Sequence, residues 1–416
     1  MLNKIRNLLK HKSVNNGIWL YLLQIFNTVL PLLTLPYITR VLGAAEYGVF
    51  SIAINIVGYM QVVVEYGFGM SATRKVALNK QHDHISKLFT TVLVSRIILL
   101  LSCSVTGFVY FFINQSSPKQ GICLIVLLLS LLGYCVQQNW LFQGLQEMKY
   151  ISIVNIVART ISVILTYALV KSADDLLLYC LLYAIAPCIS GGLGFLLAKI
   201  KYHVCFVQIT LEDLVNELKQ GWYIFTTQLS SKVFGAIGIT FLGIFSIDSV
   251  VGIYSAIQKV PNIMLLIWMP ISQVMYPIVS KKMDESFQKG KQYVYRFRKI
   301  FIGLFAIAAL IVAVFSKTLV AILFGTEYAL YFYWILPLLM WMLVSINNNF
   351  WGIQILLGSG HDKEYSKCFQ IGVVCTIVFN FVLIYFGKGM GAAWAPLLSE
   401  CILGITLKRE INKITE

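Results

Sequence analysis

Four basic side chains interrupt otherwise apolar stretches of the sequence, where a charge is costly and therefore informative. They are Arg96, Arg159, Lys232 and Lys259. Only two acidic residues, Glu65 and Glu400, lie in comparable stretches. Because unpaired charge in an apolar setting is expensive, the basic excess calls for an anionic ligand. A phosphate or pyrophosphate group would supply it through charge-assisted hydrogen bonds. The pattern predicts a cationic cavity that binds a phosphorylated substrate.

Amide and hydroxyl side chains recur with helical spacing in the same kind of stretch. The residues that share a helical face in this way are Gln24, Asn27 and Thr28, then Asn155 with Arg159, then Gln228 and Ser231. Such faces avoid lipid, so they point into a helix bundle or a wet cavity. The alternative is that they hold helices together by hydrogen bonds. Asn347, the first of three consecutive asparagines, is predicted to line the same polar lumen.

Each of the two acidic residues has two possible roles. Glu65 either pairs with Arg74 or Arg96 in a structural role, or it binds a proton or a sodium ion. Glu400 is open to the same pair of roles, charge pairing or ion coupling. No nucleophile–base arrangement and no metal-ligand spacing occurs in the sequence, and the nine cysteines lack a CxxC pair. We therefore expect no enzyme activity, no metal and no cofactor.

The composition identifies the medium in which these residues work. The chain has 416 residues, 58% of them apolar and 12% charged, with a net charge of +15. A soluble domain has about 45–50% apolar and about 25% charged residues. The apolar excess is too large to bury in a soluble fold. It excludes a soluble enzyme, a nucleic-acid binder and a disordered chain.

Twelve stretches are long and apolar enough to span a membrane, which takes about 20 residues each. They are 17–38, 48–71, 86–113, 121–143, 150–170, 176–198, 220–245, 249–279, 297–324, 329–357, 365–386 and 389–407. With the N-terminus in the cytoplasm, the cytoplasmic connectors hold 24 Lys and Arg residues and the opposite connectors hold 5. This asymmetry predicts that both termini are cytoplasmic. The fold class is an all-α membrane protein with twelve transmembrane helices.

The two halves of the chain resemble each other. A shift of 204 residues places Gln24 on Gln228, and residues 46–51 on 250–255, without a gap. Six helices per repeat, each beginning in the cytoplasm, predict two pseudo-symmetric lobes around a central cavity, as in transporters. We expect a six-helix lobe over 1–200, a cytoplasmic linker over 201–219 and a second six-helix lobe over 220–416.

Several strings resemble the Wzx-type polysaccharide flippases, which belong to the multidrug/oligosaccharidyl-lipid/polysaccharide exporter (MOP) superfamily. Thr34–Gly43 followed by Glu46-Tyr47-Gly48 is similar to their first loop, and residues 65–74 to the end of their second span. Residues 254–277 resemble their eighth span, and residues 352–365 the end of their tenth. The similarity runs in order over the whole chain.

This resemblance implies a flippase that moves an undecaprenyl-pyrophosphate-linked repeat unit across the bacterial inner membrane by alternating access. The glycan would enter O-antigen, as part of lipopolysaccharide, or a related surface polymer. The resemblance carries a substrate-binding role onto Arg40, Arg74, Arg159 and Lys259. For Arg40, an interface anchor is the other reading. Partners would be the lipid-linked oligosaccharide, membrane lipids and other polysaccharide assembly proteins, with no nucleic acid, and the protein would be a monomer.

Two other functions predict different sequences. A drug/cation antiporter of the same superfamily would need acidic residues to bind a cation, yet the first span contains none. A membrane-embedded glycan enzyme would need a catalytic constellation or a large outer loop, and neither is seen. Twelve spans rather than fourteen make a lipid II flippase less favoured.

Overall fold

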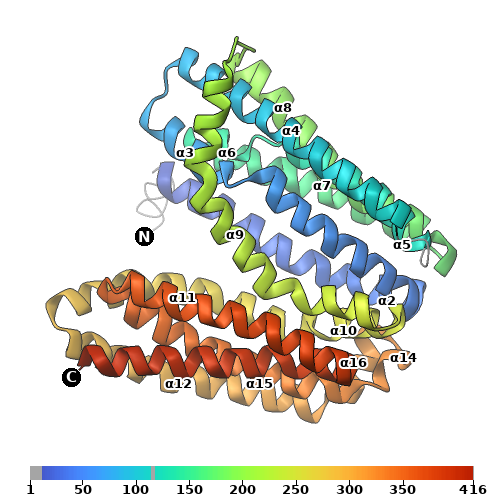
Figure 1. Ribbon diagram of the computed structural model, residues 1–416, viewed down its shortest axis with the longest axis vertical. Coiled ribbons are helices and arrows are strands. Elements are labelled where there is room, and N and C mark those ends of the chain that lie inside the picture. The colour runs from blue at the N-terminus through green and yellow to red at the C-terminus, as the bar shows by residue number, and fades with distance from the viewer. Residues whose placement is uncertain (1–11, 114–117, 416) are drawn as a thin grey trace, which may run out of the picture. The chain divides into compact units, whose positions relative to one another are not determined.

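The computed structural model describes residues 12–113 and 118–415, and these residues form helices joined by short connections, with no strand among them (Figure 1). The helices of the first half of the chain are α2 (Lys12–Glu65), α3 (Phe68–Leu78), α4 (His82–Ile113), α5 (Pro118–Val136), α6 (Asn139–Gly144), α7 (Met148–Leu169), η1 (Ala173–Asp175) and α8 (Leu176–Tyr202). Those of the second half are α9 (Leu211–Phe245), α10 (Asp248–Ile257), α11 (Lys259–Glu285), α12 (Phe287–Val314), α13 (Ser316–Phe324), α14 (Thr326–Ala329), η2 (Phe332–Trp334), α15 (Ile335–Asn349), η3 (Phe350–Leu356), η4 (Leu357–Ser359) and α16 (Asp362–Thr415).

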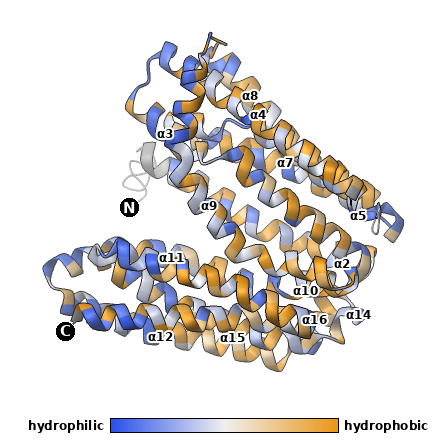
Figure 2. Ribbon diagram, in the orientation of Figure 1, coloured by the Kyte–Doolittle hydropathy of each residue, from blue (hydrophilic) through white to orange (hydrophobic). Residues whose placement is uncertain are grey.

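Within the described residues, nine helical segments are long and apolar enough to cross a membrane. Two of them contain two predicted spans each, joined across a kink at Gly43 in α2 and at Lys388 in α16, where φ is positive. The predicted span 329–357 is divided among short helices that begin at α14. In Figure 2, apolar residues follow the middle of the helices and hydrophilic ones gather at helix ends. The prediction of an all-helical, multi-pass membrane protein is confirmed, whereas the count of twelve crossings stays a prediction.

The chain forms two compact units. The first contains Met1–Tyr37 and Ile52–Lys232, and the second contains Ile38–Ser51 and Val233–Glu416. The middle part of α2, residues 38–51, therefore packs with the second unit, and the N-terminal part of α9 packs with the first. The predicted lobe boundaries at 200 and 220 follow the sequence repeat, whereas these units follow contacts in space.

In the first unit, α5 and α8 pack with their backbones close together. A Cβ atom on Gly133 would overlap the backbone at Pro187, and one on Gly191 would overlap the carbonyl oxygen of Gly133. Small residues permit this approach, as is common between membrane helices. The approach fixes α8 against the end of α5, where the chain breaks before α6.

The connection that precedes α9 is attached to α4. The backbone N–H of Cys205 donates to Ser86 Oγ over 3.3 Å, and that of Val207 donates to Thr90 Oγ1 over 3.2 Å. Lys87 then pairs with Asp213 over 2.8 Å. Residues 203–210 have no regular secondary structure, and α9 begins at Leu211, nine residues before the predicted span. The helix begins before the apolar stretch because its first turns have a partner in α4, the ion pair between Asp213 and Lys87.

In the second unit, α2 and α10 approach closely at two glycines. A Cβ atom on Gly48 would overlap the carbonyl group of Asp248, and one on Gly252 would overlap the carbonyl oxygen of Ala44. Gly48 and Gly252 are equivalent positions of the repeat that the 204-residue shift defines. Neither position has room for a larger residue, so these two glycines set the distance between the helices.

We expect Gly48→Ala and Gly252→Ala each to lower the stability of the protein by about 1–3 kcal/mol, the usual cost of overpacking. The thermal unfolding midpoint of the purified protein measures this. Gly303→Ala is the matched control, because a Cβ atom there meets nothing within 4 Å and alanine favours a helix. Equal midpoints for Gly48→Ala and Gly303→Ala would contradict the close approach.

Candidate functional site

Lys232 lies in the first unit, in the middle of α9. Its side chain is half-buried, and its ammonium group lies 5.6 Å from the centre of the Tyr59 ring. A Cβ atom on Gly58 would lie 2.5 Å from Lys232 Nζ, so the absence of a side chain at Gly58 makes room for the ammonium group. The contact with an aromatic face stabilises the charge in a poorly hydrated setting.

Arg159 is on α7 of the same unit. Its side chain is half-buried and interacts electrostatically with Tyr134 at the end of α5. Within the described part of the chain, it forms no hydrogen bond and no ion pair. Its guanidinium donors are therefore available to a ligand.

The guanidinium group of Arg96 forms hydrogen bonds within the protein. It is 4% exposed, and its Nη1 donates to the carbonyl oxygens of Gln137 over 2.7 Å, Tyr134 over 3.4 Å and Cys135 over 3.5 Å. These carbonyls lie at the C-terminal end of α5, where a helix leaves acceptors without partners and where a positive charge is favourable. Arg96 thus stabilises the break between α5 and α6.

Neither of the pairs considered for Glu65 forms in the structure. Glu65 Oε1 accepts a hydrogen bond from Gln61 Nε2 over 2.9 Å. No ion pair joins it to Arg74 or Arg96 among the described residues, although its charge acts on Arg96 electrostatically. Arg74 is exposed on α3 and has no described partner. The two roles considered for Glu65 both stay predictions.

A polar cluster centres on Gln137, which the sequence analysis did not single out. Gln137 Nε2 donates to Asn155 Oδ1 and to Ser190 Oγ, both over 3.3 Å, and its carbonyl accepts from Arg96. Asn155 is the only predicted lumen residue in this cluster. The signal in the sequence was the Gln137-Gln138 pair inside an otherwise apolar stretch.

The other predicted polar residues of the first unit are less connected. Gln24 and Ser231 are exposed, and Asn27, Thr28 and Gln228 are half-buried. Thr28 donates to the carbonyl oxygen of Gln24 over 2.8 Å, within its own helix. Asn27 Oδ1 is buried and accepts no hydrogen bond from any described residue. The stripe therefore keeps polar capacity that the protein does not use.

In the second unit, Lys259 and Arg40 differ in what holds them. Lys259 begins α11, and its side chain is exposed, with no hydrogen bond or ion pair to the described residues. Arg40 Nη2 donates to the carbonyl oxygen of Ile322 in α13. Nearby, the backbone N–H of Ala44 donates to Glu327 over 3.2 Å. Arg40 is thus in contact with the end of α13, whereas Lys259 stays available.

The three consecutive asparagines point to three different partners. Asn347 Oδ1 accepts from Arg298 Nε over 2.6 Å, and Asn348 Nδ2 donates to Glu400 Oε2 over 2.6 Å. Asn349 Oδ1 accepts from Ser272 Oγ over 2.7 Å. They precede η3, a π-helix, and such turns re-aim side chains and are frequent at functional sites. Arg298 and Ser272 are contacts that the sequence analysis missed.

Glu400 is buried beside Asn348 and lies at 3% exposure. Ser345 is a second hydrogen-bonding partner of its carboxyl group. No basic side chain of the described chain lies within ion-pair distance. Among the described residues, Asn348 and Ser345 are the side chains that hydrogen-bond to this carboxyl group, and both roles predicted for it stay predictions.

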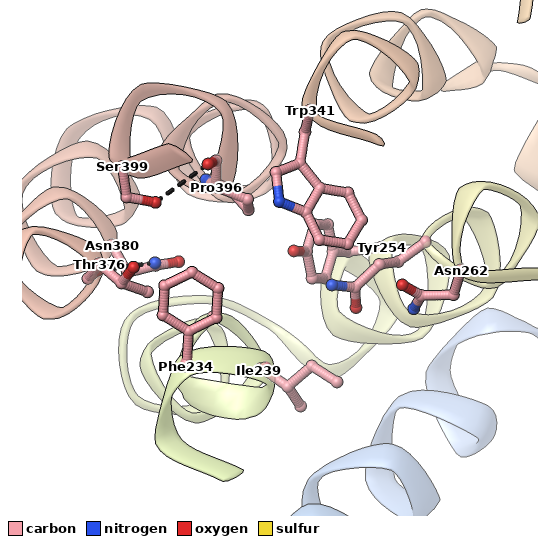
Figure 3. A pocket seen from close by; sticks show the side chains of 12 residues that line it. Phe234, Ile239, Tyr254, Asn262, Trp341, Thr376, Asn380, Pro396 and Ser399 are labelled. Carbon is pink, nitrogen blue, oxygen red and sulfur yellow. Dashed lines mark hydrogen bonds between the residues drawn. The ribbon is translucent and has the colours of Figure 1, made fainter. Parts of the chain in front are cut away.

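A cavity of about 80 Å³, lined by both polar and apolar side chains, lies in the second unit between α9, α10, α11, α15 and α16 (Figure 3). The hydroxyls of Thr376 and Ser399 donate to backbone carbonyls of α16, which leaves their lone pairs free. Asn380 Oδ1 is buried and accepts no hydrogen bond from a described residue. The cavity, which also contains Tyr254 and Trp341, therefore offers acceptors and carries no charged side chain.

Comparison with known proteins identifies the family to which this chain is similar. The family described as "Polysaccharide biosynthesis protein" matches residues 13–283. The "Putative O-antigen transporter" of Escherichia coli (strain K12) is 26% identical over 391 residues, which cover 93% of this chain and 94% of that protein. The "Probable low-salt glycan biosynthesis flippase Agl15" of Haloferax volcanii is 22% identical over 398 residues, covering 93% and 81%.

Solved structures share the fold. A structure of the lipid II flippase MurJ in an inward closed conformation has a TM-score of 0.75 at 11% identity, over 96% of this chain and 87% of that one. An inward-facing multidrug resistance MATE family transporter of the MOP superfamily has a TM-score of 0.68 at 11% identity, over 93% and 99%. Since the family match extends over more than half of the sequence, the chain belongs to the polysaccharide biosynthesis protein family of membrane transport proteins.

Proposed function

We propose that the protein is a flippase for a lipid-linked oligosaccharide. It would translocate an undecaprenyl-pyrophosphate-linked repeat unit across the bacterial inner membrane, for O-antigen or a related surface polysaccharide. The observation that carries this proposal is the family match together with full-length similarity to relatives named as an O-antigen transporter and a glycan flippase. These names describe transport and not catalysis.

We assign the anionic part of the substrate to three basic residues that the sequence places inside apolar stretches. Arg159 and Lys232 in the first unit, and separately Lys259 in the second, are half-buried or exposed. Arg159 and Lys259 donate no hydrogen bond to a described residue, which supports a role in holding a pyrophosphate by charge-assisted hydrogen bonds. The polar stripe formed by Gln24, Asn27, Thr28, Gln228 and Ser231 would face the sugar hydroxyls.

We further propose that the chain crosses the membrane twelve times with both termini in the cytoplasm, and that it works as a monomer by alternating access. The count of 24 basic residues against 5 in the connectors supports the orientation. The sequence repeat supports two lobes, 1–200 and 220–416, which the linker 201–219 joins. Alternating access would come from a rocking of one lobe against the other.

A drug/cation antiporter has the same fold, so the fold does not separate the two functions. The names of the relatives that match over most of the chain do separate them, because they describe an O-antigen transporter and a glycan flippase. We therefore do not favour antiport.

The sidedness of the lipid-linked glycan in a deletion strain of the source bacterium tests the function directly. We expect repeat units to accumulate in the cytoplasmic leaflet of the inner membrane while the surface polymer disappears, because synthesis continues without translocation. A membrane-impermeant glycan label on intact and broken spheroplasts measures this. Unchanged surface polymer together with unchanged lipid-linked glycan would refute the proposal.

The double substitution Lys232→Ala with Arg159→Ala tests the assigned site. We expect polymer export to fall about ten-fold or more at normal membrane levels, since each charged hydrogen bond contributes about 1.5–3 kcal/mol. Lys317→Ala, an exposed lysine in α13 without a described partner, is the control and should export normally. Normal export by the double variant at limiting expression would remove these residues from the site.

Arg96 should behave differently, because we assign it to the α5–α6 break. Arg96→Met removes the arginine donor from three carbonyl oxygens, of which that of Tyr134 keeps the backbone N–H of Gln137. Each buried group left unsatisfied costs about 1–3 kcal/mol. We expect less protein in the membrane and a lower unfolding midpoint, with export reduced in proportion to protein. Full stability with lost export would instead place Arg96 among the substrate-binding residues.

A further inference from the structure

Arg298 is the basic residue whose surroundings the sequence analysis did not foresee. It lies in the basic segment 281–299, at the start of the expected span 297–324. In the structure it lies on α12, which packs against α15 and η3. Its side chain is half-buried, so it is neither a freely solvated surface arginine nor an internal one like Arg96.

Three contacts fix the orientation of this guanidinium group. Nε donates to Asn347 Oδ1 over 2.6 Å. The group also lies 5.1 Å from the centre of the Trp351 ring and 5.7 Å from that of Tyr295. Aromatic faces attract a guanidinium and hold its plane. Because Nε is occupied, the edge formed by the two Nη groups is the part that remains to donate.

That edge has no partner among the described residues, and no carboxylate lies within ion-pair distance. The surrounding segment is strongly basic, since residues 281–299 contain seven Lys and Arg residues and two acidic residues. A fixed guanidinium edge presents parallel N–H donors that match two oxygens of one phosphate or carboxylate. The site therefore selects an anion with paired oxygens.

The position of Arg298 along the chain indicates that the anion would be the phosphate of a lipid. The expected span begins at residue 297, so Arg298 lies at the expected boundary between cytoplasm and membrane, where lipid phosphates are found. Asn347 beside it accepts through Oδ1, whereas its Nδ2 donates to no described residue. An amide donor next to a phosphate site suits a hydroxylated group attached to that phosphate.

We propose that Arg298, positioned by Asn347 and Trp351, binds the pyrophosphate of the lipid-linked substrate at the cytoplasmic end of the second unit. This inference rests on the proposed flippase function, and it adds a specific residue to it. The same chemistry would accept the head group of an anionic phospholipid. A pyrophosphate offers oxygens on two linked phosphate groups to the Nη edge of Arg298 and to Nδ2 of Asn347, whereas a phospholipid offers one phosphate group, so the pair of donors favours the pyrophosphate.

Binding of undecaprenyl pyrophosphate to the purified full chain in phosphatidylcholine nanodiscs tests this. We expect Arg298→Gln to raise the dissociation constant about ten-fold or more, and Arg298→Lys to raise it less, since a point charge remains without the fork. The matched control is Lys299→Gln, the exposed neighbour without a described partner, which should change the constant less than about two-fold. Unfolding midpoints without ligand show whether each variant is folded, and Arg298→Lys keeps the test valid if Arg298→Gln is not.

Two results would overturn the proposal. One is equal weakening by Arg298→Gln and Lys299→Gln, which would mean diffuse attraction by the basic segment. The other is displacement of undecaprenyl pyrophosphate by an equal concentration of phosphatidylglycerol in the wild-type protein, which would make the site a general head-group site.

A complementation assay separates this inference from the function itself. If the wild-type chain restores surface polymer to the deletion strain and Arg298→Gln restores it equally at limiting expression, the inference fails and the flippase stands. If the wild-type chain restores no surface polymer, the proposed flippase function fails. Binding of undecaprenyl pyrophosphate that depends on Arg298 would then still show an anion site, but the bound lipid would not be a transported substrate.

Discussion

Hydrocarbon offers no hydrogen bonds, so a polar group inside a membrane protein must find its partner within the protein or in a bound ligand. This constraint explains the buried contacts of both units. Arg96 donates to the carbonyl oxygens left free where α5 ends, and Gln137 links that break to Asn155 and Ser190. In the second unit, Asn348 stabilises the buried carboxyl group of Glu400. Each of these contacts allows a helix to end, bend or pack.

The same constraint separates groups that the fold uses from groups that it leaves available. Arg96 and Arg40 donate to backbone carbonyls, so their charges serve helix ends. Arg159 and Lys259 have no such bonds among the described residues. A charge retained near the membrane without a protein partner costs free energy in every resting molecule. The proposed pyrophosphate substrate would recover that cost when it binds, which is a physical reason for such residues to persist.

The sequence predicted the helical fold well, because apolar length and charge asymmetry are local signals. It also marked Gly48 and Gly252 as equivalent positions, and the structure places their backbones against each other. It did not predict the break after α5 or the π-helix at Phe350, since both depend on tertiary partners. For the site, helical periodicity singled out Asn155 and the run of three asparagines singled out Asn347, but neither pattern could show that Asn347 is bonded to Arg298. A basic residue near a span boundary looks the same in sequence whether it is solvated or held between two helices.

The fold alone cannot decide what this protein transports, since a lipid II flippase and a multidrug transporter share it at 11% identity. Selectivity must therefore lie in side chains, and here the sign of the available charge matters most. Coulomb attraction in a medium of low dielectric constant is strong enough that a basic site excludes cations as effectively as it attracts anions. In this chain Glu65 and Glu400 are bonded to amides, whereas Arg159 and Lys259 have no hydrogen bond or ion pair to a described residue. A substrate bound at the proposed basic site would have to carry negative charge, and the proposed glycan on a lipid pyrophosphate satisfies that requirement where a cationic drug does not.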